Sequence, residues 1–156
     1  RMALSTVNRE GTSFTLIEDS FNANPDSMKA GLNGLKAWNS NDGKEPFRVA
    51  LLGAMLELGA DETALHTSIG TYADELGIDA IIAVGSAQDH HLDALAQALA
   101  DGARQSQSAS VDCVHDIDAA EQLVIDLARN HPDAVVLLKG SHASGLSALA
   151  ERWAKN

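Results

Sequence analysis

The sequence is poor in cysteine, in aromatic residues and in basic residues, and each shortage excludes a class of protein. Cys113 is the only cysteine, so no internal disulfide can form, and the chain is not a disulfide-stapled secreted domain. Aromatic residues make up 4% of a chain that is 45% hydrophobic, which favours helix-rich α/β packing over a β-sandwich. Lys and Arg number 11 against 22 Asp and Glu, which gives a net charge of −11. Nucleic-acid-binding surfaces are basic, so this balance argues against nucleic acid as a partner.

Familiar active-site motifs are missing as well. Gly43 and Lys44 are followed by Glu45 and lack the upstream glycine of a P-loop, and no strand leads into G-x-G-x-x-G. The sequence also contains no H-E-x-x-H zinc motif and no G-x-S-x-G elbow. No apolar run reaches the length of a membrane span and the first residues lack a signal-peptide pattern, so a cytoplasmic location is expected. We therefore assign no catalytic residue and no metal ligand to this chain.

Apolar runs and helical stripes alternate along the chain after an N-terminal hairpin. Runs that are apolar throughout are typical of parallel strands buried on both faces, and their alternation with helices predicts a doubly wound sheet. The expected fold is one Rossmann-like, three-layer α/β domain over residues 1–156. It has a mostly parallel sheet, helices on both faces and the β-hairpin first. The expected strands are 2–7, 13–18, 47–52, 80–84, 111–114 and 134–138, and the expected helices lie near 25–38, 65–76, 92–99, 117–127 and 146–153.

The stretch DSFNANPDSMKAG, residues 19–31, is predicted to be a strand-to-helix turn. Asn24 is a good N-cap, Pro25 suits the first helical position, and Asp26 places a negative charge in the first turn. A polar turn at the carboxyl end of a strand, next to free helix N–H groups, is where α/β folds hold ligands. Spacing alone leaves two interpretations open, a ligand site or only a well-capped helix start.

Three further loops follow predicted strands: LGAMLELG at 52–59, VGS at 84–86 and LKGSHASG at 138–145. The last has the clearest chemistry of its own. Lys139 brings an ammonium and Ser141 a hydroxyl to the start of a helix, a combination that suits a carboxylate or a phosphate. The alternative is an ordinary lysine at a strand end followed by a serine cap.

These four loops, in this order and with His66 after the second, resemble the C-terminal domain of the Mur ligases, the ATP-dependent ligases of peptidoglycan synthesis. The resemblance runs from residue 1 to residue 153. NANP at 22–25 is typical of the branch that adds D-alanyl-D-alanine to UDP-N-acetylmuramoyl-tripeptide. In that branch ATP, with Mg²⁺, phosphorylates the tripeptide carboxylate, and the dipeptide amine then attacks the acyl phosphate.

The resemblance implies a division of labour between domains. An N-terminal substrate domain and a central P-loop ATPase domain would precede this chain and be its partners in the bacterial cytoplasm. This domain would close over ATP and help to bind the dipeptide. By itself it would be inactive and would hold no cofactor tightly.

The same resemblance implies a nucleotide site. Asp19 matches the carboxylate that holds the ATP ribose, and Arg1 matches an arginine near the same nucleotide. Phe21 stands where the family usually has tyrosine, so ring packing is retained and the phenolic hydrogen bond is lost. Asn22 and Asn24 would shape this nucleotide edge.

A substrate site is implied at the last loop. Lys139, Gly140, Ser141 and His142 match the family loop beside the incoming dipeptide and its carboxylate. His142 replaces the usual arginine, and with it a permanent bidentate cation.

Two other interpretations remain at this stage. One is the C-terminal domain of a sister Mur ligase that adds a different amino acid, which NANP at 22–25 disfavours. The other is a stand-alone Rossmann-like module that binds a nucleotide or an amino acid. An upstream P-loop in the same reading frame would support a ligase over the stand-alone module.

Overall fold

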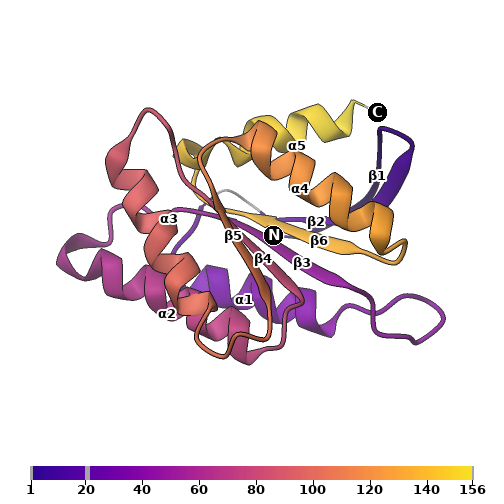
Figure 1. Cartoon of the computed structure of the whole chain (residues 1–156), viewed down its shortest axis with the longest axis horizontal. Coiled ribbons are helices and arrows are strands. Elements are labelled where there is room, and N and C mark those ends of the chain that lie inside the picture. The colour runs from indigo at the N-terminus through magenta and orange to yellow at the C-terminus, as the bar shows by residue number, and fades with distance from the viewer. Residues whose placement is uncertain (1, 20–21, 156) are drawn as a thin grey trace.

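Among residues 2–19 and 22–155, six strands form one sheet in the order β1-β2-β6-β3-β4-β5, with helices on both of its faces (Figure 1). The structure is a computed structural model and describes residues 2–19 and 22–155. The strands are β1 (Ala3–Arg9), β2 (Thr12–Glu18), β3 (Arg48–Gly53), β4 (Ala80–Val84), β5 (Ser110–Val114) and β6 (Val135–Lys139). The helices are α1 (Pro25–Ala37), α2 (Glu62–Glu75), α3 (His90–Ala103), α4 (Ile117–Asn130) and α5 (Leu146–Ala154), with short 3₁₀ turns η1 (Gly59–Asp61) and η2 (His142–Ser144).

The N-terminal hairpin pairs β1 and β2 antiparallel, with Arg9 opposite Thr12. Its turn is therefore two residues long, because β1 and β2 both run closer to the turn than the expected strands 2–7 and 13–18. Glu10 and Gly11 both have positive φ, 49° and 77°, as the favoured two-residue hairpin turns require.

The other strand pairs are all parallel, which confirms the predicted fold class. Strands β3, β4 and β5 follow one another along the chain and lie side by side in the sheet. Helices α1, α2 and α3, which precede them in turn or connect them, cover one face. The chain then returns through α4 to insert β6 between β2 and β3, and α4 and α5 cover the opposite face. Figure 1 shows these two helical layers on either side of the strands. No helix among residues 2–19 and 22–155 is long and apolar enough to cross a membrane.

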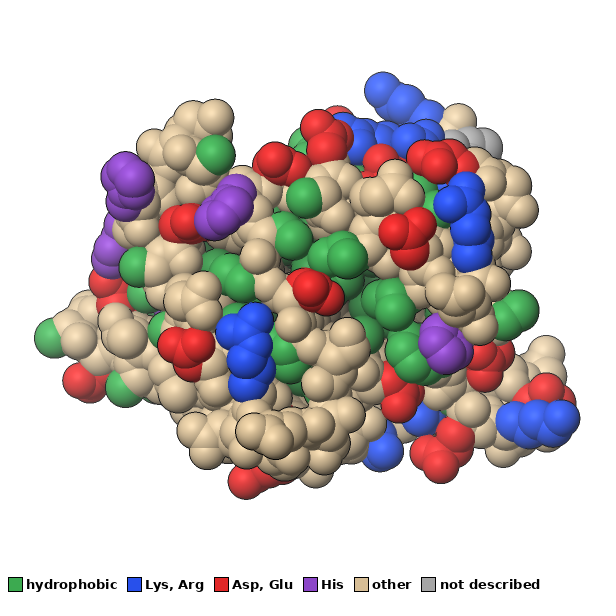
Figure 2. Space-filling model, in the orientation of Figure 1, with side chains coloured by type: hydrophobic (Ala, Val, Ile, Leu, Met, Phe, Trp, Pro, Cys, Tyr) green, Lys and Arg blue, Asp and Glu red, His purple; other side chains and the backbone are tan. Residues whose placement is uncertain are grey.

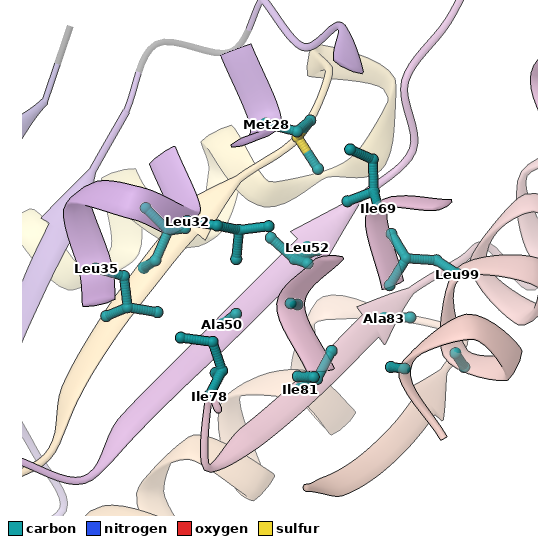
Figure 3. Close-up of a cluster of buried hydrophobic side chains, with 14 of the residues drawn as sticks. Met28, Leu32, Leu35, Ala50, Leu52, Ile69, Ile78, Ile81, Ala83 and Leu99 are labelled. Atoms are coloured by element: carbon teal, nitrogen blue, oxygen red, sulfur yellow. The ribbon is translucent and has the colours of Figure 1, made fainter. Parts of the chain in front are cut away.

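The apolar run of strand β3 is continuous because the strand is buried on both of its faces. Ala50 and Leu52 pack in the core on the side of α1 to α3, whereas Val49 and Leu51 pack under α4 and α5. Figure 3 shows the first of these cores, where side chains of α1 such as Leu32 lie over the strand. Full burial of a leucine contributes about 1.5–3 kcal/mol, so both layers depend on this strand.

Helices α2 and α3 touch through their backbones. A Cβ added to Gly70 of α2 would lie 1.9 Å from the carbonyl oxygen of Leu99, and one added to Gly102 of α3 would lie 2.0 Å from that of Thr67. Neither helix can carry a side chain at its crossing point. The two glycines therefore fix how closely these helices approach.

A buried carboxylate on α4 ties the second helical layer to the hairpin. Glu121 accepts hydrogen bonds from Arg9 Nε (2.9 Å), Arg152 Nη1 (2.8 Å) and Trp153 Nε1 (2.7 Å). Burial raises the pKa of Glu121, but the hydrogen bonds from Trp153, Arg152 and Arg9 outweigh it and leave the pKa below its ordinary value. The charged form of Glu121 is thus the stable one in the folded protein.

Replacing Glu121 with glutamine is expected to lower the free energy of unfolding by about 2 kcal/mol, since the donors lose a charged acceptor. Urea denaturation measures this change. The matched control is Glu151→Gln on exposed α5 surface, which should change stability little. If the two substitutions lowered the free energy of unfolding equally, the hydrogen bonds to Glu121 would not be the cause of the loss.

Candidate functional site at the carboxyl edge of the sheet

The loops predicted to carry function lie at one edge of the sheet, where the parallel strands end. Strand β6 lies between β2 and β3. The chain leaves β2 toward the α1 layer but leaves β6 toward the α5 layer, so the loops after these neighbouring strands diverge. Such a switch point opens a crevice at the carboxyl ends of the strands, the usual ligand position in open α/β sheets.

Asp19 and Lys139 form an ion pair at this switch point. Lys139 Nζ lies 3.0 Å from Asp19 Oδ2. Lys139 is 1% exposed and Asp19 is 8% exposed, so the pair is withdrawn from water. Gly31 of α1 makes room, because a Cβ there would lie 3.0 Å from Lys139 Cδ and 3.5 Å from Asp19 Oδ2. The structure thus joins the residue predicted at the nucleotide to the one predicted at the dipeptide.

The turn after β6 is packed directly on the end of β3. A Cβ on Gly140 would lie 2.8 Å from the Cα of Gly53. The N–H of Ser141 donates to the carbonyl of Ala54 at 3.0 Å, and the hydroxyl of Ser144 donates to the carbonyl of Ser141. The hydroxyl of Ser141 itself is buried and has no hydrogen-bond partner among the described residues.

The loop after β2 is shaped by the cap of α1. Asn24 Oδ1 accepts the N–H of Ser27 (2.9 Å), and Ser27 Oγ accepts the N–H of Asn24 (3.0 Å). This reciprocal capping box shows the helix-start role predicted for Asn24. Arg1 and Phe21, also predicted at the nucleotide, lie outside the described residues.

One pocket of about 390 Å³ brings the two predicted sites together. Asn22 lines it from the loop after β2, and Ser141 and His142 line it from the turn after β6. Leu56 and Glu57 close it from the loop after β3. Glu57 has φ of 61°, a left-handed conformation that is uncommon outside glycine.

His66 has a structural role behind this loop. It is fully buried, and its Nε2 accepts the N–H of Met55 at 2.9 Å. The other ring nitrogen, Nδ1, therefore carries the proton and donates to the carbonyl of Glu62 at 2.7 Å. The neutral ring ties the loop after β3 to α2, and burial lowers the pKa of His66 below 6.5.

Acidification is expected to weaken the fold through His66. Its pKa is lower in the folded than in the unfolded chain, so the unfolded chain binds more protons once the pH falls below 6.5. The stability is therefore present above that pH and declines toward the folded pKa, by at most about 1.4 kcal/mol per pH unit for one proton. Urea denaturation at a series of pH values from neutral to mildly acidic measures this slope.

The control is His66→Gln, which offers an amide oxygen to Met55 and does not titrate. The difference in stability between wild type and His66→Gln should shrink as the pH falls. A constant difference would show that His66 does not contribute to the acid sensitivity.

Sequence reasoning missed one polar cluster at this edge. Asp93 of α3 lies 2.8 Å from the ring of His115, which follows β5. These residues are far apart in sequence and form no motif, so only the fold brings them together. Among the described residues, no group of three or more His, Cys, Asp or Glu could hold a metal ion.

The fold and the site define a Rossmann-like α/β domain whose ligand edge is made by the loops after β2, β3 and β6. The profile of the family described as "Mur ligase, glutamate ligase domain" matches residues 1–142. The chain belongs to the Mur ligase family.

Two curated relatives share one name. The UDP-N-acetylmuramoyl-tripeptide–D-alanyl-D-alanine ligase of Mycobacterium tuberculosis (strain CDC 1551 / Oshkosh) is 38% identical over 151 residues, which are 93% of this chain and 29% of that ligase. The ligase of the same name from Escherichia coli K12 is 30% identical over 90% of this chain and 27% of its own length. The chain thus spans less than a third of these relatives.

Solved structures agree on the fold. A crystal structure of MurF from Acinetobacter baumannii superposes with a TM-score of 0.72 at 25% identity, covering 98% of this chain and 30% of that one. MurF from Thermotoga maritima in complex with ADP gives a TM-score of 0.62 at 20% identity, over 96% of this chain and 30% of that one.

Proposed function

We propose that this chain is the C-terminal domain of an ATP-dependent ligase that adds D-alanyl-D-alanine to UDP-N-acetylmuramoyl-tripeptide. The observation that carries this proposal is the pocket where Asn22 faces the turn of Ser141 and His142. One wall comes from the predicted nucleotide loop and the other from the predicted dipeptide loop. A site between the two would bring the incoming amine close to an acyl phosphate formed with ATP. The 38% identity to the mycobacterial ligase supports this choice of acceptor and donor.

On the nucleotide side, Asp19 would face the ATP ribose through its small exposed part, with Asn22 beside it. Arg1 and Phe21 would complete this side. The phosphates and Mg²⁺ would be held by a central P-loop domain, since this sequence has no P-loop of its own. The domain would therefore close over a nucleotide bound elsewhere and hold none tightly alone, in the bacterial cytoplasm.

On the dipeptide side, Gly140 lets the turn approach β3, and the free hydroxyl of Ser141 would donate a hydrogen bond to the substrate. His142 would lie beside the dipeptide carboxylate. Lys139 is buried, so it would not meet the dipeptide as an exposed cation. It would act indirectly, through its ion pair with Asp19.

A substrate comparison tests this function in the full-length protein that contains this chain. With UDP-N-acetylmuramoyl-tripeptide and ATP, we expect kcat/KM for D-alanyl-D-alanine to exceed that for L-alanine, D-glutamate or a diamino acid by at least about 100-fold. Product is measured by mass and by phosphate release. Preference for a single amino acid would instead indicate a sister ligase. The 156 residues alone should not hydrolyse ATP, and ATP hydrolysis by them would contradict the proposed division of labour.

A further inference from the structure

A second pocket, of about 220 Å³, adjoins the first at the same edge of the sheet. It lies between the loop after β4, the loop after β5 and the start of α5, and Figure 1 shows the last two next to each other. Ala143 lines both pockets, so the two are neighbours. Polar groups reach the second pocket from Ser86, Gln88, His115 and Asp116. None of the residues predicted from sequence for nucleotide or dipeptide lines it.

His115 is held in one orientation by Asp93. Asp93 Oδ1 lies 2.8 Å from Nδ1 of His115 and also accepts the N–H of Ser86 at 3.2 Å. Gly85 makes this possible, because a Cβ there would lie 2.2 Å from the same carboxylate oxygen. The N–H of Ser86 thus holds the Asp93 carboxylate in place beside the imidazole.

The pairing also sets the tautomer of His115. A carboxylate only accepts, so Nδ1 must carry the proton that it donates to Asp93, and in the neutral ring Nε2 is left with its lone pair. Nε2 has no hydrogen-bond partner among residues 2–19 and 22–155. An imidazole nitrogen with a free lone pair can accept a proton, as a general base does.

The lining of this pocket favours a donor rather than an anion. The described residues that line it include no Lys or Arg. Its charged member is Asp116, whose carboxylate caps α4 by accepting the N–H of Ala119 at 2.7 Å. Asp93 adds a second carboxylate behind His115. A ligand group with N–H donors and positive charge fits this set, as the ammonium of an amine does.

We propose that this pocket receives the amino group of the incoming dipeptide and that His115 takes a proton from it. The inference rests on the proposed function and adds a residue that the family resemblance did not supply. The ammonium gives one proton to Nε2, and the free amine attacks the acyl phosphate carbonyl. As the C–N bond forms and the C–O bond to phosphate breaks, the second proton leaves with the phosphate. Asp93 is the positioning residue that holds the ring.

The test compares two nucleophiles in the full-length ligase. The first is D-alanyl-D-alanine, and the second is hydroxylamine, which is uncharged at neutral pH and traps the acyl phosphate without a proton acceptor. His115→Ala should lower kcat with the dipeptide about 100-fold, the usual size of a lost general base, and leave hydroxamate formation unchanged. Added imidazole should restore part of the dipeptide rate. His115 is 61% exposed, so its truncation should leave the fold intact.

Two further variants sharpen the result. Asp93→Asn should lower the dipeptide rate about tenfold, since the ring stays but loses its orientation. His90→Ala, an exposed histidine on the same helix as Asp93, is the matched control and should act like wild type. A His115→Ala enzyme within twofold of the wild-type rate overturns the inference, as does equal loss with both nucleophiles. A wild-type enzyme that makes no product from the dipeptide contradicts the proposed function itself, and the inference with it.

Discussion

Replacing Lys139 with methionine is expected to lower the free energy of unfolding by about 3–5 kcal/mol. The methionine keeps most of the volume but leaves the carboxylate of Asp19, 8% exposed, without the ammonium that lies 3.0 Å away. A buried charge that loses its partner keeps its desolvation cost and loses the attraction that offset it. Urea denaturation of the 156-residue chain measures the change.

The double variant Asp19→Asn, Lys139→Met is the matched control. It removes both charges, so most of the lost stability should return. If the double variant were as unstable as the sum of the two single variants, the pair would not be a coupled unit. This coupling would also affect assays of the full-length ligase proposed above, where Asp19→Ala is expected to raise the KM for ATP far more than Lys139→Ala does. Kinetic effects at either residue need comparison with the charge-free double variant, because each substitution disturbs the other residue.

Gly70→Ala should destabilise the chain by about 3 kcal/mol or more, the upper range for overpacking. Its new Cβ would lie 1.9 Å from the carbonyl oxygen of Leu99 and 2.7 Å from the amide nitrogen of Ala103. Both atoms belong to the backbone of α3, so no rotamer change relieves the overlap, and the helices must move apart. Thermal and urea unfolding both report this loss.

Gly34→Ala makes the same chemical change in the middle of α1. Its Cβ would meet only the flexible end of the Met2 side chain. Alanine is favoured over glycine in a helix by about 1 kcal/mol, so this variant should be neutral or more stable. A similar loss from both substitutions would mean that close helix contact at Gly70 is not the cause.

Sequence periodicity is enough to predict the fold because most helices and strands are determined by the pattern of apolar and capping residues within their own segment. The apolar run at 80–84 predicts a strand buried on both faces, and it forms β4, every residue of which is buried. The cap at Asn24 and Pro25 predicted where α1 begins, and the helix begins at Pro25. These features depend on neighbours along the chain.

What the sequence could not supply are contacts between residues that are far apart along the chain. The sequence points to both Asp19 and Lys139, but as members of two separate sites, because spacing carries no information on which strands are adjacent. Histidine is common in ligand sites, so residue type alone does not reveal the role of His66. Its burial and its two hydrogen bonds show that it holds the loop after β3 in place. The Asp93–His115 pair forms no motif. The roles of Asp19, Asn22, Ser141 and His142 toward ligands remain predictions that the kinetic experiments address.

The position of β6 has a consequence for how the chain is made. It is the last of the six described strands along the sequence, yet it lies in the interior of the sheet between β2 and β3. Until it emerges, the hairpin and the β3-β4-β5 sheet have no strand to join them, and each presents an open edge. Unpaired edges recruit other strands, so the growing chain is most prone to aggregate after β5 has been made and before β6 is available. A chain that stops before Val135 would therefore form two unjoined half-sheets rather than a smaller domain.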